Sequence, residues 1–182
     1  MTGNMIVLSV VLGIGLAANA GPSEPVKGAA LRVMLSEVQP GAMTTEHYCM
    51  LVFVDHRFHA EKANRKMGKD RDRRVYGGQL SEAEWNALTE ILDSKEFREL
   101  KVTPSMSPLI VEDSHPYTIS VAREKGYQNM EFLDNKSRKP YESQLKPLLQ
   151  WWKSLRSSRM SESTAPPDDR CALDSTHAIF SN

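Results

Sequence analysis

Cysteine is scarce in this sequence, because Cys49 and Cys171 are the two that occur among 182 residues. Small domains that depend on several disulfides carry a denser cysteine framework, so that class of protein is excluded. Net charge is lacking too, since 23 basic residues balance 23 acidic ones. A neutral chain has no overall attraction to nucleic acid or to an anionic membrane. We therefore expect a hydrophobic core to stabilise the fold, and charge does not identify a partner.

Motifs that mark a catalytic centre are also missing. The chain contains no Gly-x-Ser-x-Gly and no His-Glu-x-x-His pattern, which are local signatures of two hydrolase classes. Gly77-Gly78 is not followed by the Lys-Ser/Thr pair of a phosphate-binding loop, and we interpret it as a turn. A missing motif does not exclude an enzyme, but it favours a non-catalytic protein. No cofactor and no metal are expected.

The sequence carries one long apolar run, from Met5 to Ala18. At about 1.5 Å per residue a helix of this length rises ~21 Å, too little for the ~30 Å hydrocarbon core of a membrane. The run ends in Ala18-Asn19-Ala20, a small-x-small pattern typical of signal peptidase sites. We therefore predict a signal peptide over residues 1–20, cleavage after Ala20, and a periplasmic or secreted protein without a stable membrane span. The alternative is a buried N-terminal helix, because residues 1–4 lack the Lys or Arg that normally orients a signal.

Composition divides the remaining chain into a linker, one domain and a tail. Residues 21–29 are rich in Pro, Gly and Ser, and residues 157–182 consist mainly of Ser, Thr, Pro, Asp and Arg with few apolar residues. Such segments bury too little apolar surface to fold, which predicts a disordered C-terminal tail. Residues 30–156 are long enough to form a single domain with its own core.

Apolar patterns predict several strands in the first half of this domain. Residues 31–36 alternate with the period of two of a strand. Residues 48–54 are seven consecutive apolar residues, which indicates a central strand covered on both faces. Residues 57–61 alternate after a turn and predict a hairpin partner, and residues 75–76 predict a further short strand.

A helix is predicted to begin at Ser81. Ser81 and Glu84 have the spacing of a capping box, and Leu80 and Trp85 occupy the two positions of a hydrophobic staple. One face of this helix carries four apolar side chains, namely Trp85, Leu88, Ile91 and Leu92. Residues 96–100 are expected to add a turn that covers the edge of the core.

The second half repeats the order of hairpin and helix. Residues 117–122 and 130–132 predict two strands joined by a turn at residues 124–126. The following helix has an apolar face made of Tyr141, Leu145, Leu148, Leu149, Trp152 and Leu155. Pro147 is tolerated only in a first turn, so the regular helix begins near Ser143 or is kinked. The whole predicts an α+β fold, a small antiparallel sheet with two amphipathic helices packed on one face.

The segment from Lys62 to Arg74 is predicted to be a charged loop with a surplus of five positive charges. Such a surplus attracts anionic polymers, and an anionic envelope polymer is the expected ligand class. The candidate binding residues in it are Lys66, Lys69, Arg71, Arg73 and Arg74. Because the segment has no aromatic residue before Tyr76, a solubilising loop is the favoured interpretation. Trp151, at the margin of the apolar helix face, is a further candidate for a binding patch.

Histidines near carboxylates give a second alternative, a small hydrolase or a metal-binding protein. His56 and His59 lie close to Asp55 and Glu61, with His47 nearby, and His115 follows Glu112 and Asp113. On a strand His59 and Glu61 share a face, whereas His56 and His59 point to opposite faces. The spacing therefore does not make a ready metal site, and solvated turn and edge residues are the favoured interpretation.

Cys49 lies inside the most apolar predicted strand, where burial raises the pKa of a thiol and denies access to it. We interpret it as a buried structural thiol, and a disulfide with Cys171 is the alternative that an oxidising compartment permits. Taken together, these patterns predict an exported, non-catalytic binding or structural module of the cell envelope or extracellular space. Its partner is expected to be an envelope protein or an anionic envelope polymer.

Overall fold

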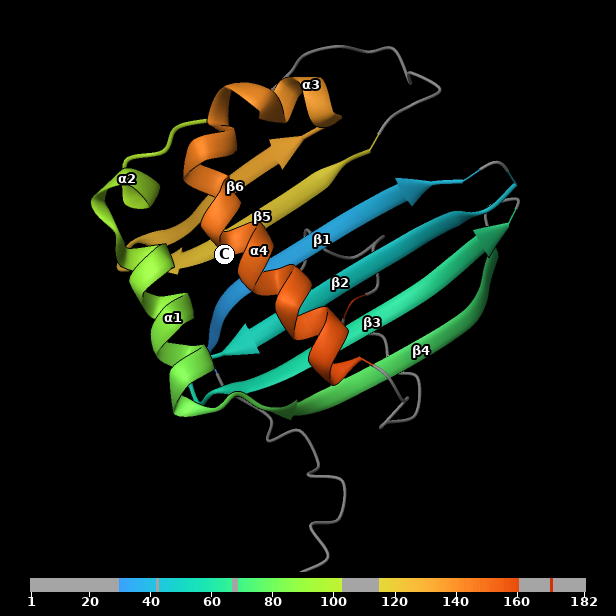
Figure 1. Ribbon diagram of the computed structural model, residues 1–182, viewed down its shortest axis with the longest axis horizontal. Coiled ribbons are helices and arrows are strands. Elements are labelled where there is room, and N and C mark those ends of the chain that lie inside the picture. Colours follow the sequence, from blue (N-terminus) through green and yellow to red (C-terminus); the bar gives the residue numbers. More distant parts are fainter. Residues whose placement is uncertain (1–29, 42, 67–68, 103–114, 161–170, 172–182) are drawn as a thin grey trace, which may run out of the picture.

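The computed structural model describes residues 30–41, 43–66, 69–102, 115–160 and 171 (Figure 1). The predicted signal peptide, the linker and most of the predicted tail lie outside these residues. The last helix ends at Arg159, so it extends three residues into the stretch predicted to be a tail. Among the described residues no helix is both long and apolar enough to cross a membrane.

Within the described ranges, six antiparallel strands form a single sheet in the order β4-β3-β2-β1-β5-β6. The strands are β1 (Leu31–Pro40), β2 (Thr45–Phe53), β3 (Arg57–Lys66), β4 (Lys69–Gln79), β5 (Tyr117–Arg123) and β6 (Gly126–Phe132). The helices are α1 (Glu82–Asp93), α2 (Lys95–Arg98), α3 (Asn135–Arg138) and α4 (Glu142–Arg159), with a short 3-10 turn η1 (Lys139–Tyr141) before α4. The predicted mixed α+β class is confirmed.

The main core joins the helices to the sheet. Figure 1 shows α4 lying across the strands, with α1 beside it. Alternate residues of β1, β2, β5 and β6 contribute side chains to one cluster with the apolar faces of α1, α2 and α4. Its most deeply buried members include Val33, Leu35, Met50, Leu88, Leu92, Phe97, Ile119, Met130, Phe132, Leu145, Leu148 and Trp152. Each large apolar side chain buried in this way contributes about 1.5–3 kcal/mol to the hydrophobic stabilisation.

Local sequence signals account for where the helices begin. The Ser81 hydroxyl accepts from the backbone N–H of Glu84, whose carboxylate accepts from the backbone N–H of Ser81, so the predicted capping box is present. α4 begins at Glu142, close to the predicted start, and contains Pro147. The predicted turn between β5 and β6 places Gly126 at a φ of 89°, which glycine adopts without strain.

The strand β2 is buried on both faces, as the apolar run predicts. Residues 48–52 are all buried, whereas Val54 is exposed in the turn before β3. On the side of β2 away from the main core, Met34, Leu51, Cys49 and Cys171 belong to a second apolar cluster.

Cys49 and Cys171 form a disulfide, with their Cα atoms 5.9 Å apart and their positions 122 apart in the sequence. The interpretation of Cys49 as a free buried thiol was therefore wrong. It rested on burial alone, which a half-cystine in a core strand shares. The bond ties the C-terminal segment at Cys171 to the centre of the sheet.

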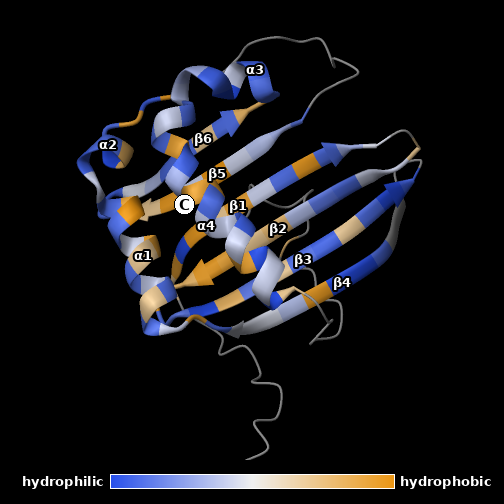
Figure 2. Ribbon diagram, viewed as in Figure 1, coloured by the Kyte–Doolittle hydropathy of each residue, from blue (hydrophilic) through white to orange (hydrophobic). Residues whose placement is uncertain are grey.

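The prediction of a loop from Lys62 to Arg74 was also wrong, because residues 62–66 belong to β3 and residues 69–74 to β4, and the two strands pair. Figure 2 shows that β3 and β4 are mainly hydrophilic where β3 ends and β4 begins. Charged side chains that face solvent do not prevent backbone pairing, and they are common on edge strands such as β4. Gly77-Gly78 is likewise part of β4 and not a turn. A Cβ at Gly78 would lie 2.9 Å from the Phe58 ring, so glycine allows this close contact.

Replacing Cys171 with Ser should lower the free energy of unfolding by about 5 kcal/mol, because the disulfide closes a loop of more than 100 residues. Urea denaturation without reductant, in the presence of a chelator, measures the change. Reductant should destabilise the unmodified protein by a similar amount and leave Cys171→Ser unaffected. Equal midpoints for the oxidised and the reduced protein would contradict the role given to this disulfide.

Candidate functional site

A groove of about 550 Å³ lies between the C-terminal half of α4 and the sheet. The lining residues are Glu37, Gln39, Tyr48, Lys62, Tyr76, Tyr117, Leu149, Trp152, Lys153, Arg156, Ser157 and Met160. This volume is within the range of about 300–1,000 Å³ in which small-molecule sites fall.

Glu37 is a buried carboxylate at the inner wall of this groove, with 2% of its surface exposed. It follows Val33 and Leu35 on β1 in the register that faces the main core, so a charge stands where an apolar residue is expected. One oxygen accepts hydrogen bonds from Gln39 Nε2 (2.6 Å), from His115 Nε2 (2.9 Å) and from the Tyr117 hydroxyl. The other accepts from a guanidinium nitrogen of Arg156 at 2.6 Å.

These partners keep Glu37 ionised. Burial alone raises the pKa of its carboxyl, but the hydrogen bonds from Tyr117, Gln39 and His115 and the charge of Arg156 together outweigh burial, so the pKa lies below the ordinary value. Burial and the neighbouring Glu37 carboxylate raise the pKa of Tyr117. Glu37 therefore carries a negative charge at neutral pH, and this charge holds Arg156 in place.

The guanidinium of Arg156, which lines the groove, packs against two aromatic rings. Its guanidinium carbon lies 3.6 Å from the centre of the Tyr48 ring and 5.5 Å from that of Trp152. Lys62 lies on the same Tyr48 ring at 5.1 Å and pairs with Glu46 at 3.1 Å. Cation–π contacts of this kind fix the orientation of both cations.

The lining combines positive charge with apolar surface. Lys62, Lys153 and Arg156 supply three cations, and Glu37 supplies one anion. Lys153 is exposed, and its amine has no partner among the described residues. Leu149 and Met160 are partly buried and pack against the core from the groove side. The arrangement can hold an anionic group beside an apolar one.

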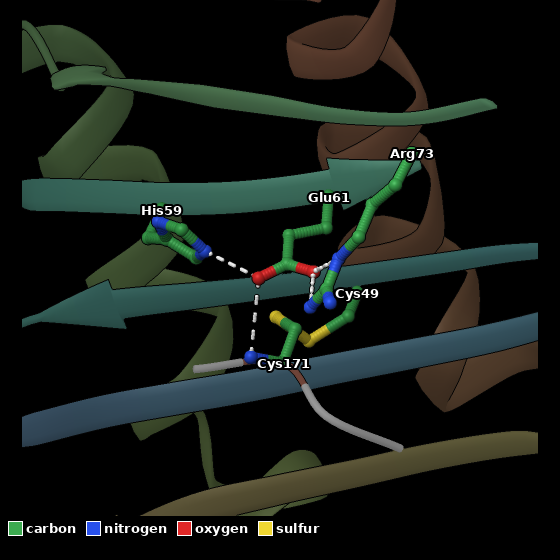
Figure 3. The surroundings of a disulfide bond; sticks show 5 residues. All are labelled: Cys49, His59, Glu61, Arg73 and Cys171. Atoms are coloured by element: carbon green, nitrogen blue, oxygen red, sulfur yellow. Dashed lines mark hydrogen bonds and ion pairs between the residues drawn. A yellow bond between two sulfur atoms is a disulfide. The ribbon is translucent and has the colours of Figure 1, made fainter. Parts of the chain in front are cut away.

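A second buried carboxylate, Glu61, lies on the opposite face of the sheet (Figure 3). One oxygen of Glu61 lies 2.7 Å from His59 Nε2 and accepts the backbone N–H of Cys171 at 3.2 Å. The other accepts two hydrogen bonds from the guanidinium of Arg73, one of them 2.7 Å long. The prediction that His59 and Glu61 share a face of a strand is confirmed.

Glu61 has the same electrostatic character as Glu37. Burial raises the pKa of the Glu61 carboxyl, but hydrogen bonds from His59 and Arg73 and their charges outweigh burial, so its pKa lies below the ordinary value. The carboxylate joins β3, β4 and the segment at Cys171, beside the disulfide.

The three candidate histidines each meet a different glutamate. His56 lies 3.5 Å from Glu82 and stacks on Trp85 with ring centres 4.2 Å apart, whereas His59 and His115 contact Glu61 and Glu37. They do not combine into one catalytic cluster. The acidic neighbours of His115 at positions 112 and 113 lie outside the described residues.

The candidate basic residues are dispersed along the β3–β4 hairpin. Arg73 is bound to Glu61, Lys66 is half-buried and Arg74 is exposed. The side chains of Lys69 and Arg71 lie outside the described part of the structure. Pairing of Arg73 with Glu61, and of Lys62 with Glu46, reduces the local surplus of positive charge.

Trp151 is half-buried, and its indole N–H donates to the backbone carbonyl of Glu84 at 3.0 Å. Trp151 therefore links α4 to α1.

A Ser-x-x-Lys spacing, which in some hydrolases holds a nucleophilic serine, occurs at the start of α4 in Ser143 and Lys146. Both side chains are exposed, and the Ser143 hydroxyl donates to Gln144, so this pair has no catalytic geometry.

Sequence reasoning missed Glu37 and Arg156, which are 119 positions apart. A signal for each was present. Glu37 continues the inward register of Val33 and Leu35, and Arg156 follows Trp152 by one helical turn on the buried face. Two opposite charges at inward positions of different elements are expected to pair.

No protein-family model matches the chain, and a search of curated proteins finds no significant relative.

Replacing Glu37 with Gln should reduce the acid sensitivity of the fold. The folded pKa lies below the unfolded value near 4.5, so Glu37 stabilises the protein above that pH and this contribution is lost as the pH falls through the folded pKa. At pH 7 the variant should lose about 1–3 kcal/mol, and it should lose less than the unmodified protein between pH 7 and pH 3.

Urea denaturation at a series of pH values measures this difference. The exposed Glu131→Gln serves as the matched control and should follow the unmodified protein. A Glu37→Gln variant with the pH dependence of the unmodified protein would mean that folding does not lower the pKa of the Glu37 carboxyl.

Proposed function

We propose that this protein is an exported, non-catalytic binding module of the cell envelope or extracellular space. In this proposal the groove beside α4 holds a small anionic ligand that has an apolar part. The observation that carries it is the lining, in which Lys153, without a partner among the described residues, stands with the paired Lys62 and Arg156 beside two partly buried apolar side chains.

Two features support export. The apolar run before Ala18-Asn19-Ala20 has the length of a signal peptide. The disulfide between Cys49 and Cys171 requires an oxidising compartment to form and persist. The proposal places the mature protein, beginning at Gly21, in the periplasm or outside the cell.

The packing of the helices supports the position of the groove. We propose that α1 and α4 lie on the same face of the sheet, since both contribute to one core cluster, whereas Cys171 belongs to the cluster of the other face. α4 then serves as one wall of the groove, and β1 to β4 with β5 provide its floor.

The buried carboxylate prepares the groove for an anion. Glu37 occupies one edge of the Arg156 guanidinium and holds it against Tyr48, so its orientation is fixed before a ligand arrives. Lys153, one turn earlier on α4, places a second positive charge at the same opening. An anion between these two side chains gains charge-assisted hydrogen bonds without rearrangement of the wall.

The groove is favoured over the basic hairpin as a binding site. Arg73 is engaged with Glu61, so it is not available to a polymer without loss of that pair. Binding of a polyanion by Lys66, Lys69, Arg71 and Arg74 remains the alternative proposal. A hydrolase or metal-binding protein that combines His56, His59 and His115 in one centre is supported less, because each of them contacts a different glutamate.

Octanoate, which combines a carboxylate with an apolar chain, should bind the mature oxidised protein in the groove. Amide shifts in NMR titrations should report binding near Lys153 and Leu149. Lys153→Glu should weaken binding at least about tenfold, because it replaces attraction by repulsion at the opening. Lys146→Glu, the same change at an exposed site of α4 outside the groove, should have no effect.

Two further probes separate the contributions. Inorganic phosphate tests charge without an apolar part, and octanol tests the apolar part without charge; both should bind more weakly than octanoate. Octanoate that binds Lys153→Glu as well as the unmodified protein, or that produces no shifts at the groove at millimolar concentration, would refute the proposed site.

A further inference from the structure

Four side chains that can ligate zinc gather on the face of the sheet opposite the groove (Figure 3). Cys49 is on β2, His59 and Glu61 are on β3, and Cys171 reaches them from the C-terminal segment. Donor atoms of His59, Glu61 and Cys171 all lie within 4.8 Å of one another, and Cys49 is bonded to Cys171. All four residues are buried.

These donors match the chemistry of zinc. Thiolate, imidazole and carboxylate are its protein ligands, and structural zinc sites use four of them in a tetrahedron. With bonds of about 2.0–2.3 Å, donor atoms in such a tetrahedron are separated by roughly 3.3–3.8 Å. The donor atoms of His59, Glu61 and Cys171, which lie within 4.8 Å of one another, can reach that geometry through shifts of about 1 Å.

In the oxidised protein the disulfide occupies both sulfur atoms. We propose that reduction of Cys49–Cys171 converts this cluster into a zinc site formed by Cys49, Cys171, His59 and Glu61. A dithiol supplies two electrons and two protons, so the protein disulfide becomes two thiols while the dithiol becomes a disulfide. Zinc then binds as the two thiols lose their protons to solvent.

The strand pairing holds the ligands in place when the disulfide is open. Cys49 is directly opposite Glu61 in the ladder between β2 and β3, and Leu51 is opposite His59. Residues in directly opposite positions have Cβ atoms about 4.5–5.5 Å apart. Three of the four ligands are therefore positioned by two paired strands, and only Cys171 depends on its own segment.

Arg73 completes the charge balance of the proposed site. Two thiolates and the Glu61 carboxylate carry three negative charges, which zinc and the Arg73 guanidinium together neutralise. Arg73 binds one oxygen of Glu61 and leaves the oxygen that faces His59 and Cys171 for the metal. A neutral assembly is compatible with the burial of this region, whereas an uncompensated charge would not be.

The inference goes beyond the proposed binding function, because it concerns the opposite face. The disulfide and the metal are alternative links between Cys171 and β2. In an oxidising compartment the disulfide holds the segment, and under reducing conditions zinc holds it. Oxidation of the zinc form would release the ion.

Cobalt(II) is a suitable probe, because thiolate ligation gives a sulfur-to-cobalt charge-transfer band. The mature chain is compared in its oxidised form and after reduction with a phosphine under anaerobic conditions. The reduced protein should bind one cobalt ion with this band and with the visible spectrum of a tetrahedral site, and the oxidised protein should show neither. Zinc should displace the cobalt.

Variants assign the ligands. Cys49→Ser should weaken the charge-transfer band, and His59→Ala should weaken cobalt binding by at least about tenfold. His56→Ala is the matched control, because His56 stacks on Trp85 away from the cluster, and it should leave the affinity unchanged. If His59→Ala fails to fold, His59→Gln, which can still donate to Glu61, takes its place.

Circular dichroism of the reduced metal-free chain covers the case in which it unfolds. Zinc should then restore the spectrum of the folded protein in proportion to the metal added. Reduced protein that binds no cobalt, that stays unfolded with zinc, or that binds cobalt equally well after loss of His59 would overturn the proposal.

Discussion

The ion pair between Glu37 and Arg156 is the interaction on which the groove face of this fold depends. It joins β1 to α4 across 119 residues of sequence, and His115 and Tyr117 bring β5 to the same carboxylate. Burial of an isolated carboxylate would cost several kcal/mol, and removal of one partner from a buried pair is strongly destabilising. Because Glu37 has a donor at both oxygens, the cost is offset and the charge is kept. The pair fixes the end of α4 against the sheet and, through Arg156, the wall of the groove.

The opposite face of the sheet also contains a buried carboxylate that is stabilised by hydrogen-bond donors, but with different residues. Glu61 accepts from Arg73, His59 and the backbone of Cys171, so a buried carboxylate again joins segments that are distant in sequence. Beside it the disulfide adds a covalent constraint that the groove face lacks. The two faces therefore differ in purpose in our account. The groove face leaves Lys153 available to a ligand, whereas the charges of the other face pair with one another beside Cys171.

The periodicity of apolar residues and the helix-capping motif predicted most of the strands and helices, because both are local properties of the chain. The apolar run at residues 48–54, the capping box at Ser81 and the apolar face around Trp152 each correspond to an observed strand or helix. Errors arose where long-range pairing decides the outcome. The charged residues near Arg73 form a hairpin because their backbones pair with a neighbouring strand, and Cys49 is oxidised because Cys171 lies beside it in space. The inward positions of Glu37 and Arg156 are local signals, but their pairing was missed for the same reason, since no local pattern records the distance between β1 and α4.

We propose that the chain is exported and works in its oxidised form. The most direct test of this proposal is the intact mass of the protein recovered from each cell fraction after expression with residues 1–20 in a bacterial host. The account predicts a non-cytoplasmic product that begins at Gly21 and is two hydrogens lighter than its reduced form. A full-length product with Met1 and two free thiols, confined to the cytoplasm, would contradict it.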